Sequence, residues 1–321
     1  MSVRSRDPEV LLGQARQGDR AALARLLSMI ERGGDDARVI SRLAYPLAGK
    51  AYTVGLTGAP GAGKSTLTSA TIGHLRSQQL EVAVLAIDPT SPFSGGAILG
   101  DRVRMQEHAT DPGVFIRSMA TRGHLGGLSL ATPEAIRLLD AVGRHWVLVE
   151  TVGVGQVEVE IAGKADTTVV VVNPGWGDSV QANKAGLMEI ADVFVINKAD
   201  RKGVEETKRD LELMLDLSDL SELGDWRPPI VSTVGSEGKG VPELWDAVLA
   251  HRAHIEANGF LVRRRERRLR DELREIVARR LERKAREICT GERWDELGDQ
   301  VLAHTTDPWT AADEMLQAVD A

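Results

Sequence analysis

An eight-residue, glycine-rich stretch at residues 58–65, GAPGAGKS, carries the clearest chemistry in this sequence. It matches the pattern G-x-x-x-x-G-K-[ST] of loops that bind nucleotide phosphates. Glycines let backbone N–H groups point at phosphate oxygens, and the positive end of the following helix attracts the same anion. In such a loop Lys64 reaches the β- and γ-phosphates and the Ser65 hydroxyl binds Mg²⁺. The residues expected to hold the phosphates are Gly58, Ala59, Pro60, Gly61, Ala62, Gly63, Lys64, Ser65 and Thr66.

A second motif, residues 197–200 with the sequence NKAD, points to guanine as the base. The Asp200 carboxylate can accept hydrogen bonds from the N1–H and the 2-amino group of guanine, a donor pair that adenine lacks. Lys198 would lie along the base, and Asn197 would tie this loop to the phosphate loop. Ser232, Thr233 and Val234 end another β-rich run, where a backbone N–H would meet guanine O6 or where the run simply stops.

The second position of the phosphate loop also separates nucleotide classes. It holds Ala59, whereas certain dimeric ATPases carry there a lysine that reaches across their interface. Together with the guanine motif, this predicts a GTPase that binds GTP and GDP rather than an ATPase.

Three carboxylates are expected around the γ-phosphate and its metal ion. Asp88 ends a β-rich run and can hold a Mg²⁺-bound water, and Asp101 closes a glycine-rich segment. Glu150 stands where GTPases usually carry the aspartate of Asp-x-x-Gly, and the Gly153 N–H would sense the γ-phosphate. Each acid alone is more simply an exposed loop carboxylate, but together with Ser65 they predict a Mg²⁺ site.

These motifs need a scaffold that brings strand ends together. Helix-length segments separate most of the β-rich runs, and this alternation predicts an α/β fold with a mostly parallel sheet flanked by helices. Right-handed crossovers would gather the loops after the strands at one edge of that sheet. The β-rich runs are residues 51–57, 82–87, 114–118, 146–150, 167–172, 193–196 and 229–233.

Both ends of the chain are expected to be helical. We predict an N-terminal helical extension at residues 1–48, a nucleotide-binding domain at 49–258 and a C-terminal helical arm at 259–321. The arm combines an apolar stripe at helical spacing with many arginines. A nucleic-acid or membrane-binding helix is one interpretation. The interleaved acids favour a charged amphipathic helix that packs or dimerises and carries i,i+4 ion pairs.

Length and composition set wider limits. The chain has 321 residues, a net charge of −7 and a single cysteine, Cys289, so it has no internal disulfide framework. The acidic balance gives no reason to expect nucleic-acid binding. The apolar runs are too short to span a bilayer and no secretory leader is apparent, so we expect a cytoplasmic protein without membrane contact.

Several long strings now resemble one family, the MeaB/MMAA/ArgK GTPases, over roughly residues 40–260. The strings are residues 57–66 (TGAPGAGKST), 88–101 (DPTSPFSGGAILGD), 150–156 (ETVGVGQ), 173–186 (NPGWGDSVQANKAG) and 189–192 (EIAD).

The resemblance implies a P-loop GTPase of the SIMIBI class. It also implies a chaperone of adenosylcobalamin-dependent methylmalonyl-CoA mutase that gates cofactor loading and protects or reactivates the mutase. Family members are typically homodimers joined through the C-terminal arm. By the same resemblance, residues 88–101 look like switch I, residues 150–156 like switch II and residues 173–186 like an additional switch.

Hydrolysis by this chain alone is expected to be slow. Val154, not glutamine, follows Gly153, so the water-positioning arrangement of Ras-like GTPases is absent. A partner would then be needed to order the switches. The catalytic candidates are Lys64, Asp101, Glu150, Gln156 and Lys184.

Other classes of function remain open at this stage. A phosphotransferase linked to amino-acid transport would need an acceptor pocket and a base, neither of which is identifiable. A metal-delivery GTPase would need clustered histidines or cysteines. The seven histidines are scattered, and the i,i+3 pair His251 and His254 is interpreted as a helix-surface pair.

Overall fold

The computed structural model describes residues 6–89, 105–121, 127–151, 164–175, 189–217 and 226–320. The chain forms two compact units, Met1–Arg265 and Glu266–Ala321. The division into parts at residues 48/49 and 258/259 stays a prediction.

A seven-stranded parallel sheet forms the centre of the first unit, in the order β3-β2-β4-β1-β5-β6-β7. This arrangement confirms the predicted α/β fold, because all seven β-rich runs are strands. Parallel strands end at a common edge wherever their connections cross over, so the motifs that follow them start close together. The strands are β1 (Tyr52–Gly58), β2 (Val82–Pro89), β3 (Val114–Thr121), β4 (Trp146–Thr151), β5 (Thr167–Val172), β6 (Val193–Asn197) and β7 (Ile230–Thr233).

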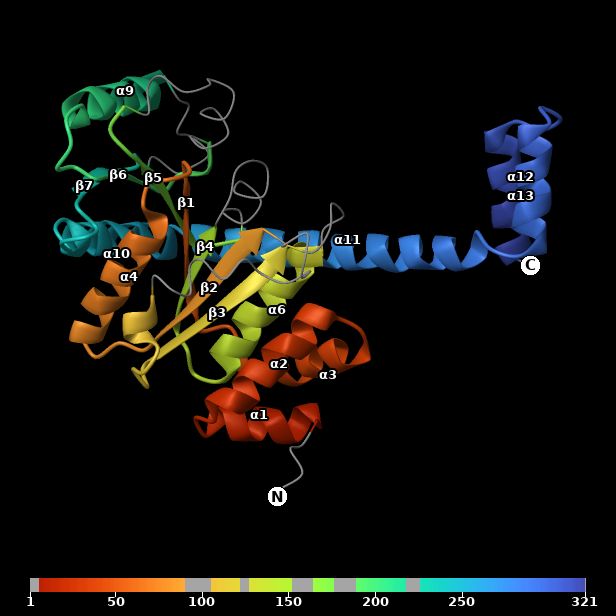
Figure 1. The fold of residues 1–321 in the computed structure, drawn as a ribbon, viewed down its shortest axis with the longest axis horizontal. Coiled ribbons are helices and arrows are strands. Elements are labelled where there is room, and N and C mark those ends of the chain that lie inside the picture. The colour runs from red at the N-terminus through yellow and green to blue at the C-terminus, as the bar shows by residue number, and fades with distance from the viewer. Residues whose placement is uncertain are drawn as a thin grey trace. The chain divides into compact units, whose positions relative to one another are not determined.

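Helices cover both faces of the sheet, which explains its continuous apolar strands. Alternate residues of β2 face opposite sides. Ala83, Leu85 and Ile87 join the core beneath the N-terminal helices, while Val82 and Val84 join the other core. Figure 1 shows α4 and α10 against one face and α2, α3 and α6 against the other. These helices are α2 (Arg20–Arg32), α3 (Asp35–Ala44), α4 (Lys64–Ser77), α6 (Gly127–Ala141) and α10 (Val241–Ala257).

The N-terminal extension is helical, as predicted. Asp7 and Asp19 cap α1 (Pro8–Arg16) and α2 by accepting backbone N–H bonds. Glu31 of α2 pairs with Arg117 of β3, so the extension is tied to the sheet as well as packed on it. The 3₁₀ helix η1 (Tyr45–Leu47) leads on toward β1, η2 (Gln106–His108) precedes β3 and α9 (Val204–Leu217) follows β6.

The root of α11 (Phe260–Ile288) is fixed by two neighbouring arginines at the edge of the sheet where the strands begin. Arg265 donates to both carboxylate oxygens of Asp166, at 3.1 and 2.7 Å. Arg264 donates to both oxygens of Asp192, at 3.2 and 3.0 Å. The arginine-rich stretch therefore includes two residues that anchor the helix.

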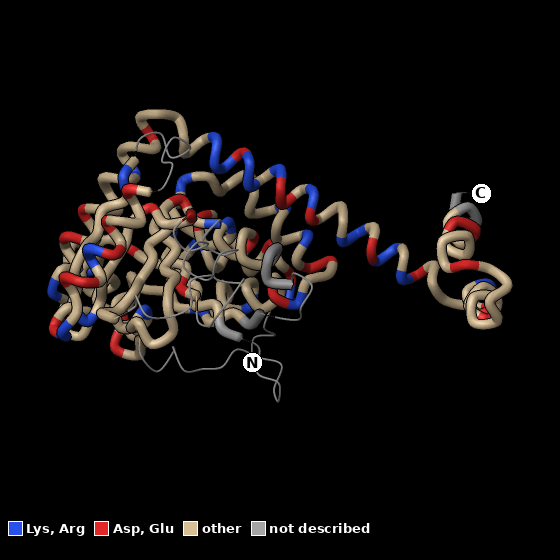
Figure 2. The backbone as a smooth tube through the Cα atoms, turned by 90° about the horizontal axis from the view of Figure 1, so that it is seen from above, with Lys and Arg blue, Asp and Glu red and all other residues tan. Residues whose placement is uncertain are grey.

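Beyond this root, basic and acidic residues alternate along α11, as Figure 2 shows. The predicted i,i+4 pairs are present between Glu275 and Arg279 and between Glu282 and Arg286, at 2.7 and 2.6 Å. In the second unit, α12 (Glu292–Leu302) and α13 (Pro308–Asp320) enclose a small core of Leu297, Ala311 and Met315. None of the helices in the described residues combines the length and the apolar character needed to cross a membrane.

Candidate functional site

The phosphate loop joins β1 to α4 and requires glycine at both of its ends. Gly58 has φ +132°, and a Cβ there would lie 2.0 Å from the carbonyl oxygen of Val171 in β5. Gly63 has φ +90° and caps α4, and a Cβ there would lie 2.6 Å from Nδ2 of Asn197. Larger residues would therefore push the loop away from the neighbouring strand and from the base motif.

Lys64 and Ser65 occupy the first turn of α4 and are almost completely buried, at 7% and 4% exposure. The Lys64 ammonium folds back over the loop and donates to the carbonyls of Gly58 at 2.7 Å and Ala59 at 3.2 Å. The cation is thus held inside the ring of the loop, next to the start of the helix. A phosphate in this ring would meet a positive charge and the helix N-terminus together.

Asn197, at the end of β6, connects the phosphate loop to the loop after β7. Its Nδ2 donates to the carbonyl of Ala62 at 2.8 Å. Its Oδ1 accepts from the Thr233 hydroxyl and from the Gly235 N–H, both at 3.0 Å. The Asn197 side chain is buried, and both its nitrogen and its oxygen make hydrogen bonds. The phosphate loop, the NKAD motif and the loop after β7 therefore form one rigid rim.

Lys198 reaches across the same rim, with its ammonium 2.6 Å from the carbonyl of Gly61. Its backbone is left-handed, with φ +61°. The chain turns here, and Ala199 N–H bonds to the carbonyl of Thr233 at 2.9 Å. Asp200 is exposed next to this turn. All members of the NKAD motif therefore adjoin the phosphate loop or the loop after β7.

Ser232, Thr233 and Val234 are the residues expected to offer a backbone N–H to guanine O6, and the N–H of one of them, Val234, is already engaged. The Val234 N–H donates to the carbonyl of Lys239 at 3.0 Å, in an isolated antiparallel bridge. Gly240 closes this turn with φ +76°, where a Cβ would lie 2.2 Å from the carbonyl of Ser232. Among the described residues, the Ser236 N–H makes no backbone hydrogen bond and is another candidate for this contact.

Glu150 stands in the middle of the sheet, completely buried on β4. It lies opposite Leu56 of β1 and Ala86 of β2. Both of these neighbours belong to the core on the α4 side, so Glu150 is on the face that carries the phosphate loop's helix. Beside it, the Thr151 and Thr57 hydroxyls are 3.2 Å apart.

The remaining predicted site residues are less fully described. Asp88 is near the end of β2, paired with Ala120 in backbone register. Asp101, Gly153, Gln156 and Lys184 lie outside the described residues. The structure therefore assembles Ser65, Lys64 and Glu150 on one side of the sheet and leaves the switch residues as predictions.

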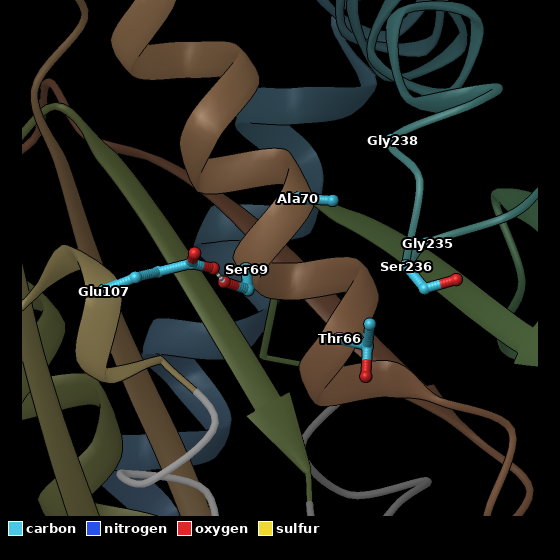
Figure 3. Close-up of a pocket in the computed structure, with 7 residues that line it drawn as sticks. All are labelled: Thr66, Ser69, Ala70, Glu107, Gly235, Ser236 and Gly238. Atoms are coloured by element: carbon cyan, nitrogen blue, oxygen red, sulfur yellow. Dashed lines mark hydrogen bonds between the residues drawn. The ribbon is translucent and has the colours of Figure 1, made fainter.

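A pocket of about 300 Å³ lies between the first turns of α4 and the loop after β7 (Figure 3). Of its lining residues, the sequence motifs identified only Thr66. The run of glycines after β7 could have signalled a binding loop, but no pattern marked Glu107. The lining residues are Thr66, Ser69, Ala70, Glu107, Gly235, Ser236 and Gly238.

His251 of α10 is part of the packed interior of the fold. His251 is fully buried, which makes the expectation of a helix-surface pair wrong for this residue. Its Nδ1 lies 2.8 Å from the Thr167 hydroxyl and its Nε2 lies 3.1 Å from Asp192. Among the described residues there is no group of three or more histidine, cysteine, aspartate or glutamate side chains suited to a metal ion.

Comparison with known proteins identifies related chains. A family model described as "Methylmalonyl Co-A mutase-associated GTPase MeaB" matches residues 23–290. A "Putative GTPase" of Pyrococcus abyssi is 52% identical over 311 residues, which are 96% of either chain. "GTPase ArgK" of Escherichia coli is 39% identical over 254 residues, 77% of this chain and 76% of that one.

A solved structure has the same fold over its whole length. It is described as "Crystal structure of LAO/AO transport system kinase" and superimposes with a TM-score of 0.73, at 25% sequence identity. The alignment covers 100% of both chains, so the helices at both ends have counterparts in that protein.

Proposed function

The chain belongs to the MeaB family of methylmalonyl-CoA mutase-associated GTPases, and from this premise we propose that its GTP cycle controls an adenosylcobalamin-dependent acyl-CoA mutase. Methylmalonyl-CoA mutase is the partner that the family description favours. In this role the GTPase gates loading of the mutase with its cofactor and protects or reactivates the mutase. GTP hydrolysis in this role therefore serves to change the state of the mutase, and not to supply GDP or phosphate as a metabolic product.

One observation carries this proposal: the fixed part of the site is built from strand ends other than those that lead into the segments we assign to switching. Asn197 locks the phosphate loop to the NKAD motif and the loop after β7. The segments assigned to switching follow β4 and β5, which are the two neighbours of β1, and β2, which lies beyond β4. A rigid nucleotide rim flanked by segments that respond to the γ-phosphate is the architecture of a switch.

The donor set on the α4 face fits Mg²⁺. The ion prefers oxygen ligands, and both the Ser65 hydroxyl and the Glu150 carboxylate are buried at this end of the sheet. Asp88 and Asp101 complete the proposed set. Bound Mg²⁺ would neutralise charge that develops on the β- and γ-phosphate oxygens. Lys64 supplies the second positive charge from inside the loop.

The C-terminal arm supports a homodimer as the working form. No described residue of α11 is buried within one chain. Yet the helix carries exposed apolar side chains in a stripe at four- and seven-residue spacing, which a second copy would cover. The stripe consists of Val262, Leu269, Leu273, Val277 and Leu281.

The proposal is tested by phosphate release from GTP and Mg²⁺, measured with and without a purified adenosylcobalamin-dependent methylmalonyl-CoA mutase. We expect slow hydrolysis by the GTPase alone, because Val154 follows Gly153. Stoichiometric mutase should accelerate it at least about 10-fold, since partner-ordered switches supply large rate factors.

The Lys64→Ala variant serves as the matched control. It should remain folded, because the side chain is replaced by a good helix former, and release no phosphate in either condition. If the mutase neither accelerates hydrolysis nor co-elutes with the GTPase, the mutase role is wrong while the GTPase stands. Transfer of the phosphoryl group to an amino acid or a protein would instead identify a kinase.

A further inference from the structure

The pocket beside α4 is lined both by a residue expected to hold the phosphates, Thr66, and by residues of the loop after β7, which is expected to meet the base. In the proposed site the phosphates occupy the loop up to Thr66, and the base meets Asp200 and the loop after β7. The ribose joins the two, and the pocket is lined by Thr66 at one end and by Gly235 and Ser236 at another. Its volume of about 300 Å³ is at the small end of the volumes of ligand pockets, and this suits a pocket that holds only the sugar of a nucleotide.

Glu107 supplies a carboxylate to this pocket. Figure 3 shows its side chain reaching toward Ser69 of α4 from a different element, η2. The Ser69 hydroxyl donates to Glu107 Oε1 at 2.5 Å. In the described part of the chain, Glu107 Oε2 has no recorded hydrogen-bond partner. The carboxylate is therefore oriented through one oxygen and able to accept a hydrogen bond through the other.

His108 holds this arrangement in place. Its Nε2 lies 3.0 Å from both the hydroxyl and the carbonyl oxygen of Ser69. A ring N–H directed at these two oxygens leaves the Ser69 proton for Glu107. The three side chains therefore position a carboxylate rather than activate the serine as a nucleophile, which would require the hydroxyl proton to be directed at the ring.

Glu107 shares its pocket with Thr66 of the phosphate loop. A carboxylate beside a polyanion is unfavourable unless the ligand brings hydrogen-bond donors to it. The donors of a nucleotide between its phosphates and its base are the ribose hydroxyls. Acidic residues accept hydrogen bonds from the ribose 2′-hydroxyl in dinucleotide-binding folds, so the chemistry is well suited.

We propose that Glu107 accepts a hydrogen bond from a ribose hydroxyl of the bound guanine nucleotide and so selects ribonucleotides over deoxyribonucleotides. The inference rests on the proposed nucleotide site. Ser69 and His108 are positioning residues, because they act through Glu107. The proposed ligands are therefore guanine nucleotides whose ribose keeps the hydroxyl that Glu107 binds.

The test measures dissociation constants for GDP, 2′-deoxy-GDP and 3′-deoxy-GDP by titration calorimetry of the full-length protein with Mg²⁺. A hydrogen bond to a charged acceptor should make GDP bind about 10-fold more tightly than one of the deoxy forms. In Glu107→Ala the GDP affinity should fall by that factor and the affinity for that deoxy form should stay unchanged. The ratio between the two ligands should then approach one.

Glu256→Ala is the matched control. Glu256 lies on α10, outside the pocket lining, and pairs with Arg252 at 2.8 Å. It should keep the full preference for GDP. Glu107 is on the surface, so Glu107→Ala should keep the wild-type melting temperature.

GDP binding without discrimination at either hydroxyl, or with a preference that survives in Glu107→Ala, would overturn the role of Glu107 and leave the GTPase proposal intact. Failure of the wild-type protein to bind GDP would overturn both.

Discussion

Asn197 makes hydrogen bonds to the phosphate loop and to the loop after β7. Its amide donates to Ala62, and its oxygen accepts from Thr233 and Gly235. A carboxamide can donate and accept at once, whereas an isosteric aspartate or leucine cannot. The residue type at this position therefore follows from the two sets of backbone groups it must satisfy.

Substitution of Asp200 tests whether this residue binds the guanine base. Asp200→Asn replaces the acceptor for the N1–H and 2-amino group of guanine by an amide that can donate to the 2-oxo group of xanthine. We expect GTP affinity to fall by about 100-fold or more, because an unpaired polar edge is strongly rejected, while XTP binding improves. Competition between GTP and XTP for the protein measures the change. Unaltered GTP selectivity in Asp200→Asn would show that the base lies elsewhere.

At the scale of residues, the sequence motifs predicted which residues line the nucleotide site, but they did not predict every contact these residues make. Lys64, Asn197 and Gly63 could be assigned from motif spacing, although only the Lys64 partners, Gly58 and Ala59, are a few residues away. Glu107 could not, since its position beside Ser69 depends on how η2 packs against α4. The engagement of the Val234 N–H likewise depends on a bridge to Lys239.

At the scale of elements, two aspartates link neighbouring strands where the strands begin. Asp166, just before β5, accepts the N–H of Thr53 in β1, at 3.0 Å. Asp192, just before β6, accepts the N–H of Thr168 in β5, at 2.8 Å. Each aspartate also holds one arginine of α11. The edge opposite the nucleotide site thus fixes strand register and helix position with the same carboxylates.

Asp192 also gives the stability a dependence on pH. Burial raises the pKa of its carboxyl, but the hydrogen bond and charge of His251, together with Arg264, outweigh burial and hold the pKa below its ordinary value. Since the folded pKa lies below the unfolded one, the carboxylate stabilises the fold above about pH 4, and this contribution is lost as pH falls through the folded pKa.

Asp192→Asn should therefore lower the free energy of unfolding at pH 7 by about 3 kcal/mol, because it leaves Arg264 without its counter-charge. The difference from wild type should shrink below about pH 4. Urea unfolding at pH 7, 5 and 3.5 measures both effects. Asp216→Asn is the control, since Asp216 forms an exposed pair with Arg227 worth under about 1 kcal/mol. Equal losses in the two variants would refute the anchoring role of Asp192.

At the scale of the whole molecule, the end of the nucleotide-binding unit falls just after Arg265. The unit Met1–Arg265 includes both arginines that bind Asp166 and Asp192. The apolar stripe of α11 lies mostly beyond this point. We therefore assign the stability of the nucleotide-binding unit and the proposed self-association of the arm to different stretches of one helix.

Two truncations separate these roles. A chain ending at Arg265 and a chain ending at Gly259 should both be monomers in light scattering, because both lack most of the stripe. The longer one should keep GDP affinity and stability. The shorter one should lose about 3 kcal/mol or more of unfolding free energy, because two buried carboxylates lose their arginines. A dimer that persists in the chain ending at Arg265 would place the interface outside the arm.

The sequence by itself determined the class of fold and the chemistry of the nucleotide. Alternation of β-rich and helical segments is enough to predict a parallel sheet, and the GAPGAGKS and NKAD motifs are recognisable from short runs of residue types. Only the tertiary structure showed the partners of His251, Arg264, Arg265 and Glu107. Their partners are distant in sequence. A sequence pattern cannot show whether a charged side chain faces water or a buried carboxylate. What separates those two cases is desolvation, which depends on the packing of elements around the residue.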